Sequence, residues 1–243
     1  MVWNIKALIA IPTMACKIEY RLCGWLYRIC EIEDVKPTLV FKQAMPIDSN
    51  RNMLVQDFLK TDNEWLVFID DDMIPKFEFR KIFEKIGDRK IVSAVCVAMQ
   101  QGVPGPIIMR RSVEKETSYR HLTTDELASE IEDESYIRVD GVGTGFLVIH
   151  RSVFEKIPAP WFKFQYKDDG TMGLSEDYYF SEKAKEYGFK LWVNCDLPTG
   201  HTKYVDLYEL NKILYKIVSA KKVTASGIGS HCDVKEVFEK GDK

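Results

Sequence analysis

Short apolar runs and helical apolar stripes alternate along the first two-thirds of the chain. The runs at residues 7–11, 65–69 and 91–98 are continuous, which is typical of strands buried on both faces of a sheet. Strands that alternate with helices predict an α/β fold in which a parallel sheet is wrapped by helices. The expected strands are 7–11, 38–41, 65–69, 91–98, 136–139, 146–149 and 190–193, and the expected helices are 17–30, 49–59, 77–86, 152–158, 176–188 and 206–222.

Several element ends carry their own sequence signals. Ser49 and Ser175 fit the N-cap positions of the second and fifth helices, because a serine hydroxyl can accept a hydrogen bond from a free amide of the first turn. Gly87 closes the helix at 77–86, as glycine often does after a helix. Gly200 and His201 are expected to form a turn after the last strand.

The helix at 17–30 has an unusually wide apolar surface. Such a helix is either deeply buried or covered by a partner subunit, and deep burial is the more common case. We therefore expect a buried helix, while a homodimer stays open. One stripe consists of Ile18, Leu22, Trp25 and Ile29, and the other of Tyr20, Cys23, Tyr27 and Cys30.

Two stretches resemble neither strands nor regular helices. Residues 100–134 are loop-rich and charged, with an acidic helix candidate at 125–131. Residues 223–243 follow the last helix and contain Ser226-Gly-Ile-Gly-Ser-His231, which predicts a mobile C-terminal tail that could fold over a ligand.

Composition narrows the class of protein. The 243 residues are 46% hydrophobic and 29% charged, which are ordinary globular values. A formal net charge of -3 offers no positive field for nucleic acid, so we expect no nucleic-acid partner. The chain contains no apolar run long enough for a membrane span, and a cytoplasmic location is expected. Its six cysteines form no Cys-x-x-Cys pair, which favours reduced thiols.

Three consecutive aspartates follow the strand at 65–69. They stand at the carboxyl edge of the predicted sheet, where α/β proteins bind ligands. Asp70 and Asp72 are two residues apart, so they share one side of an extended segment and can hold Mg²⁺ or Mn²⁺ against phosphates. The plain alternative is that one aspartate caps the next helix and the others face water. The strand context favours metal binding.

A second acidic pair opens the helix after Ser175. Glu176 and Asp177 fall in its first turn, where the helix dipole stabilises carboxylates by about 0.3–1 kcal/mol each. This needs no catalysis. A carboxylate held rigidly at a helix start is also suited to take a proton from an attacking hydroxyl.

Two weaker features lie at predicted strand ends. The run Gly141-Val-Gly-Thr-Gly145 lacks the spacing of a dinucleotide-binding or Walker loop. Its glycines either let backbone approach a ligand or make a tight connection between two strands. His201 is either a metal ligand or a structural histidine.

The order of these motifs resembles the GT-A glycosyltransferases, and the family 2-like enzymes in particular. The resemblance implies a Rossmann-like mixed, mostly parallel sheet flanked by helices. It covers about residues 7 to 201 and implies one catalytic domain over 1–222, with a nucleotide-binding half at 1–98 and an acceptor half at 135–222. It rests on Ile11-Pro12-Thr13, Arg51-Asn52, Phe68-Ile-Asp-Asp-Asp72-Met, the glycine run with Phe146-Leu-Val-Ile, Arg151-x-Val-Phe154, Ser175-Glu-Asp-x-x-Phe180, Gly188-Phe and Gly200-His201.

The resemblance implies a binding site for a nucleotide-diphosphate sugar. Pro12 and Thr13 would lie at the nucleotide base, while Arg51 and Asn52 would face the nucleotide. Further contacts to the donor are implied for Asp70, Asp71, Gly143, Thr144 and Gly145.

The same resemblance implies a metal-dependent transfer to an acceptor hydroxyl. Asp72 would ligate Mn²⁺ or Mg²⁺ directly, with Asp70 and His201 completing the site. Asp177 matches the general base of inverting members, with Glu176 beside it. The extra aspartate, Asp71, departs from the family pattern and leaves the exact ligand pair open.

Two other readings of the sequence remain. A nucleotidyltransferase acting on sugar phosphates would share the sheet, the aspartates and the metal, but it would carry a basic phosphate loop near the first strand. Residues 14–17 offer one lysine and no glycine. A catalytically silent nucleotide-sugar-binding protein is the third reading, and nothing in the retained carboxylates favours it.

Overall fold

The computed structural model describes residues 5–14, 17–31, 36–100, 103–111, 119–122, 126 and 135–203, together with 208, 210–212, 214 and 215. The chain divides into two compact units, residues 1–203 and 204–243, and the first contains every element discussed below. The described positions of the second unit are helical. The acidic helix candidate at 125–131 (apart from residue 126), the domain end at 222 and the tail at 223–243 lie outside the described residues.

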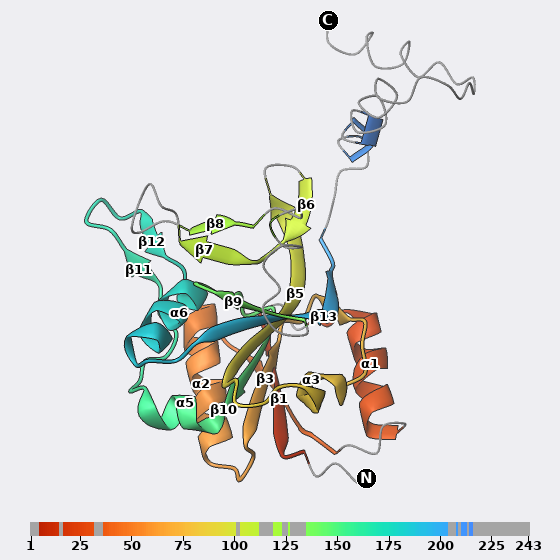
Figure 1. Cartoon of the computed structure of the whole chain (residues 1–243), viewed down its shortest axis with the longest axis vertical. Helices are drawn as coiled ribbons and strands as arrows, with labels where there is room; N and C mark the ends of the chain where they lie inside the picture. Colours follow the sequence, from red (N-terminus) through yellow and green to blue (C-terminus); the bar gives the residue numbers. More distant parts are fainter. Residues whose placement is uncertain are drawn as a thin grey trace, which may run out of the picture. The chain divides into compact units, whose positions relative to one another are not determined.

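A nine-stranded mixed sheet forms the centre of the first unit (Figure 1). Its strand order is β2-β1-β3-β10-β5-β13-β4, with β6 paired to β5 and β9 to β13. Strands β2, β1, β3, β5 and β13 run in one direction, and β10 runs against them between β3 and β5. The bounds are β1 Ala7–Thr13, β2 Thr38–Gln43, β3 Trp65–Ile69, β4 Met73–Pro75, β5 Ile91–Gln100, β6 Val103–Pro106, β9 Tyr136–Val139, β10 Phe146–His150 and β13 Leu191–His201.

Helices cover both faces of this sheet, and the alternation of side chains along the strands explains the two layers. On β1, Leu8 and Ala10 pack into one core with α2, α5 and α6, while Ile9 and Ile11 pack into a second core with α1 and α3 (Figure 1). The predicted α/β architecture is confirmed. The helices are α1 Tyr20–Glu31, α2 Ile47–Leu59, α3 Lys81–Glu84, α5 Arg151–Lys156 and α6 Glu176–Glu186.

Two small hairpins complete the first unit. One consists of β7 (Met109–Arg111) and β8 (Tyr119–His121), and the other of β11 (Gln165–Tyr166) and β12 (Met172–Leu174). The first hairpin arises from the stretch that carried no clear sequence pattern.

Two predicted helix boundaries are wrong. Helix α2 begins at Ile47 after Pro46, so Ser49 is inside the helix and is not its N-cap. The side chain that accepts a first-turn amide is that of Asp48, whose carboxylate accepts the Ser49 amide at 2.7 Å. Of the helix expected at 77–86, only Lys81–Glu84 is helical. Phe77 and Phe79 both pack against Trp25, at ring-centroid distances of 5.9 and 6.0 Å, and residues two apart in a helix would face different sides.

The expectation that α1 is deeply buried is also wrong. Leu22, Trp25 and Ile29 are buried against the sheet, but the second apolar stripe faces outward. Tyr20 is 76% exposed and Tyr27 65% exposed. Both stripes of α1 are apolar, so the spacing of apolar residues could not predict which of the two would pack against the sheet.

The turn predicted at Gly200 and His201 is absent from this described segment. Strand β13 runs on through a bulge between Asn194 and Pro198 and ends at His201, where it pairs with Met73 of β4. Pairing with β4 therefore overrides the local preference of glycine for a turn and brings His201 beside the aspartates.

Among the described residues, Cys23, Cys30, Cys96 and Cys195 are free thiols. Within the same part of the chain, every helix is too short or too polar to span a membrane.

Candidate active site

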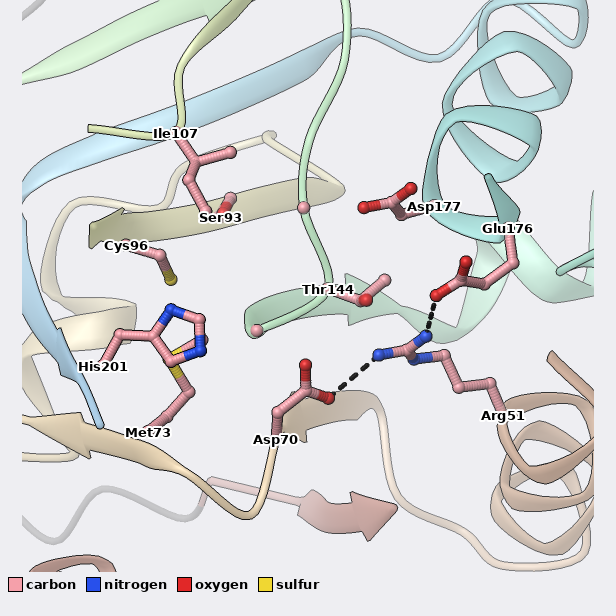
Figure 2. A pocket seen from close by; sticks show the side chains of 12 residues that line it. Arg51, Asp70, Met73, Ser93, Cys96, Ile107, Thr144, Glu176, Asp177 and His201 are labelled. Atoms are coloured by element: carbon pink, nitrogen blue, oxygen red, sulfur yellow. Dashed lines mark hydrogen bonds and ion pairs between the residues drawn. The ribbon is translucent and has the colours of Figure 1, made fainter. Parts of the chain in front are cut away.

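A pocket of about 180 Å³ opens beside the carboxyl end of β3 (Figure 2). Seven parts of the chain supply its walls: α2, the segment from the end of β3 into β4, β5, the residue after β6, the loop before β10, the start of α6 and the end of β13. The lining residues are Arg51, Asp70, Met73, Ser93, Cys96, Ile107, Gly143, Thr144, Gly145, Glu176, Asp177 and His201.

The pocket brings together eight of the residues singled out in the sequence: Arg51, Asp70, Gly143, Thr144, Gly145, Glu176, Asp177 and His201. Five others, Pro12, Thr13, Asn52, Asp71 and Asp72, are outside this lining as the described residues define it.

Arg51 links two carboxylates across the pocket. Its Nη2 donates to Asp70 Oδ1 at 2.9 Å, and its Nη1 donates to Glu176 Oε1 (Figure 2). The arginine side chain is only 4% exposed, and that of Glu176 is 11% exposed. Arg51 thus ties the end of β3 to the start of α6.

Burial and charge shift the pKa values of this group in opposite directions. Burial raises the pKa of Asp70 and of Glu176 above ordinary carboxyl values, and the Arg51 charge limits both shifts. Burial alone would lower the pKa of Arg51, but its two carboxylate partners outweigh that effect and hold the pKa above its ordinary value. The guanidinium therefore stays charged.

Asp177 leaves one carboxylate oxygen directed at the pocket. Its Oδ1 accepts the Tyr178 amide at 2.9 Å and the Ser175 hydroxyl. Its Oδ2 lies 4.0 Å from the position that a Cβ on Gly143 would take. Figure 2 shows Asp177 facing the cavity, while Glu176 turns toward Arg51. The two adjacent carboxylates therefore differ: Glu176 is paired with Arg51, whereas Asp177 directs a carboxylate oxygen into the pocket.

Asp72 lies beside His201 and Lys203 at the edge of the sheet. Its Oδ2 is 3.1 Å from His201 Nε2 and accepts a hydrogen bond from Lys203 Nζ at 2.7 Å. Burial works to raise the pKa of Asp72, but these two neighbours outweigh it and hold the pKa below its usual value. His201 Nδ1 faces the carbonyl oxygen of Val97 at 3.0 Å.

Two facing groups at this edge could take a cation between them. His201 Nε2 and Asp72 Oδ2 lie 3.1 Å apart, so either Nε2 carries a proton that it donates to the carboxylate or a cation binds both atoms. The pocket itself holds three carboxylates, those of Asp70, Glu176 and Asp177, against one arginine. An anionic diphosphate would be repelled there without a cation. No group of three or more His, Cys, Asp or Glu side chains placed to hold a metal occurs within the described ranges.

Asn52 has its whole amide engaged in the fold. Its Nδ2 donates to the carbonyls of Asp48 at 2.8 Å and Phe162 at 2.7 Å, and its Oδ1 accepts the amides of Trp161 at 2.9 Å and Phe162 at 3.2 Å. These four hydrogen bonds use both donors and both lone pairs of the side chain. Asn52 thus clamps the 161–162 loop to α2.

The three other predicted residues outside the pocket lie near the ends of β1 and β3. Pro12 is buried, and the Thr13 hydroxyl donates to the Lys17 carbonyl at 3.4 Å. The carbonyl of Asp71 accepts the Glu19 amide at 2.7 Å, which joins the aspartate turn to the start of α1.

Several residues at the site carry no functional signal in the sequence. Met73, Ser93 and Cys96 look like ordinary strand residues, and burial raises the pKa of the Cys96 thiol to about 12. Ile107 belongs to the stretch that matched no pattern. Gly145 has a packing reason, because a Cβ there would lie 2.3 Å from Met73 Cε.

Comparison with known proteins identifies a shared fold. No family model and no curated protein matches the sequence. The crystal structure of A197 from STIV matches with a TM-score of 0.55 and 21% identity, over 83% of this chain and 87% of that one. The fold described above is therefore also the fold of A197.

Two further solved structures match more weakly. One is a glycosyltransferase involved in the glycosylation of the major capsid of PBCV-1, with a TM-score of 0.35 and 12% identity over 77% of this chain and 92% of that one. The other is the inositol-1-phosphate CTP transferase from T. maritima, with a TM-score of 0.43 and 12% identity over 94% of this chain and 99% of that one. These scores are too low to establish a shared fold.

Proposed function

We propose that the chain is a metal-dependent glycosyltransferase that moves a sugar from a nucleotide-diphosphate sugar to an acceptor hydroxyl with inversion. One observation carries the proposal: a single pocket has the free Asp177 Oδ2 on one wall and Asp70 with His201 on the opposite side (Figure 2). The GT-A motif order in the sequence supports the same reaction.

Asp177 is the proposed general base. As the acceptor oxygen attacks the anomeric carbon, its proton passes to Asp177 Oδ2, and the bond from that carbon to the diphosphate oxygen breaks with its electron pair. Attack opposite the leaving group inverts the anomeric centre. The hydrogen bonds from Ser175 and Tyr178 hold Oδ1, so the basic oxygen keeps one orientation.

We assign Mn²⁺ or Mg²⁺ to Asp72 and His201, whose facing atoms lie 3.1 Å apart, with Asp70 as a third ligand that would have to move closer when the cation binds. The cation supplies charge neutralisation for the leaving diphosphate. Lys203 hydrogen-bonds the same carboxylate oxygen of Asp72, and its side chain is 51% exposed. It can therefore move toward a bound phosphate without leaving a buried charge behind.

The test measures turnover with water as the acceptor. The purified chain is incubated with Mn²⁺ and a panel of nucleotide-diphosphate sugars, and release of the nucleoside diphosphate is recorded. We expect Asp177→Asn to bind donor within about threefold of wild type while turnover falls about 10²–10⁴-fold, because a general base contributes that much.

A matched control is Asp48→Asn, since Asp48 is the second residue of α2 as Asp177 is of α6, and its turnover should stay near that of wild type. An unchanged rate in Asp177→Asn would overturn the base assignment. Pyrophosphate release from a nucleoside triphosphate and a sugar phosphate would instead identify a nucleotidyltransferase, and donor binding without any turnover would identify a silent binder.

A further inference from the structure

The β7–β8 hairpin contacts both walls of the pocket on the side of Asp177. The Asp140 amide donates to the Met109 carbonyl at 2.9 Å, and the Arg111 amide donates to Asp140 Oδ2 at 2.9 Å, which joins β7 to the loop before β10. On the helix side, Arg111 Nη2 donates to Glu182 Oε2 of α6 at 2.6 Å. The hairpin is therefore fixed to two segments that meet at the site.

Tyr119 of β8 lies at the centre of these contacts. Its ring stacks on that of Tyr178, with centroids 4.5 Å apart and planes 9° from parallel. Its hydroxyl donates to Glu182, one helical turn beyond Tyr178 on the same face of α6. Tyr178 directly follows Asp177 and donates its amide to Asp177 Oδ1. A shift of the Tyr178 backbone, which the stacked ring helps to hold in place, would therefore move the aspartate carboxylate.

Gly141 supports the same stack from below. A Cβ on this residue would lie 3.0 Å from Tyr119 Cε1 and 3.2 Å from Tyr178 Cδ1, so both rings would have to give way by a few tenths of an ångström to admit one. The loop that begins at Gly141 then lines the pocket with Gly143 and Thr144. The first glycine of this run thus serves aromatic packing rather than contact with a ligand.

We propose that the stack of Tyr119 on Tyr178 positions Asp177 against the glycine loop. Tyr119 and Tyr178 are positioning residues, since they are outside the pocket lining among the described residues. The expected change in kcat rests on the proposed function, whereas the expected change in the structure around Tyr178 does not. The β7–β8 hairpin, which belongs to the stretch without a clear sequence pattern, would therefore serve to align Asp177 with the acceptor hydroxyl.

The experiment compares Tyr119→Ala with Tyr119→Phe in the full chain. Tyr119→Ala removes the stack, so kcat should fall about 10- to 100-fold, because a misplacement near 1 Å costs up to that much. The KM for the donor should change less than threefold, since Asp70 and His201 are untouched. Tyr119→Phe keeps the ring and should restore kcat to within about threefold of wild type. Tyr20→Ala, at a tyrosine 76% exposed on α1, is the control.

A second variant and a structural readout keep the inference testable. Gly141→Ala makes both rings give way by a few tenths of an ångström without removing either, so its kcat should fall in the same direction as in Tyr119→Ala, while Gly24→Ala, whose Cβ meets nothing within 4 Å, should not change it. Hydrogen exchange at the Tyr178 amide should be at least tenfold faster in Tyr119→Ala and in Gly141→Ala, but unchanged in Tyr119→Phe.

Unchanged exchange at Tyr178 in both of these variants would overturn the inference. An equal loss of kcat in Tyr119→Phe and Tyr119→Ala would overturn it too, because the ring would then not be the part that matters. Faster exchange in a protein that shows no transfer with any donor would refute the proposed function and leave the positioning intact.

Discussion

Arg51→Met tests the ionic link across the pocket most directly. Methionine keeps much of the side-chain volume and removes the charge, so Asp70 and Glu176 lose their shared partner. Removing one member of a buried ion pair costs about 3–5 kcal/mol, because the remaining charge stays desolvated. Asp70 is 28% exposed and keeps part of its hydration, whereas Glu176 is 11% exposed. Most of the cost therefore falls on Glu176.

The assay is thermal and chemical unfolding. In a unit of this size each kcal/mol lowers the melting temperature by about 2–4 °C, so we expect Arg51→Met to melt roughly 10 °C below wild type. Lys6→Met is the control. The Lys6 side chain is 44% exposed beside Asp62, whose side chain is 88% exposed, and a surface pair contributes about 0–1 kcal/mol. Adding Glu176→Gln to Arg51→Met removes the stranded charge and should recover a large part of the lost stability.

The pH dependence gives an independent check. Burial already raises the pKa of Glu176, and loss of Arg51 raises it further. A carboxyl group whose folded pKa lies above its unfolded value binds its proton more tightly in the folded state, so the folded state gains stability as pH falls through that pKa. The deficit of Arg51→Met against wild type should thus shrink between pH 7 and pH 5. A deficit of less than 1 kcal/mol at pH 7, or one independent of pH, would refute the reasoning.

Two further predictions concern the metal site and the predicted nucleotide contact. We expect Mn²⁺ with a nucleoside diphosphate to raise the melting temperature of wild type, because a bound ligand stabilises the folded state, and we expect Asp72→Ala to abolish that rise. Asp62→Ala, at an aspartate whose side chain is 88% exposed, should keep the rise. An equal rise in both variants would remove Asp72 from the site. Asn52→Leu should lower the free energy of unfolding by about 3 kcal/mol, because it strands buried amides of the 161–162 loop, and should leave the dissociation constant of the donor within threefold. Weaker donor binding at unchanged stability would instead support the nucleotide contact expected from the motif.

The sheet and its acidic edge could be predicted from the sequence because they depend on local pattern. The strand Trp65–Ile69 was expected with these bounds, since an apolar run between polar residues fits a central strand and little else. Asp70 then had to stand at the sheet edge. The helix predicted at 77–86 is mostly absent for the opposite reason, because it depends on distant contacts. Packing of Phe77 and Phe79 against Trp25 stabilises the chain more than completing a helical turn would.

The partners of the charged residues could not be read from the sequence. Arg51 and Asn52 are adjacent, yet one links two carboxylates and the other clamps a loop. Neither role has a local signature, because the two carboxylates and the clamped loop lie 19 to 125 residues away along the chain. His201 shows the same limit, since its strand depends on pairing with β4 rather than on the residues around it.

Two contacts of different physical kind hold the start of α6 in place, one to α2 and the end of β3 and the other to the β7–β8 hairpin. Arg51 binds Glu176 through a buried ionic contact, and Tyr119 stacks on Tyr178 through an aromatic one. The ionic tie carries a desolvation cost, so its loss affects stability and pH dependence. The aromatic tie carries no net charge, so its loss should leave the pH dependence of stability unchanged while it disturbs the orientation of Asp177. Separate signatures in the two variants would therefore show that stability and alignment at this site are set by different residues.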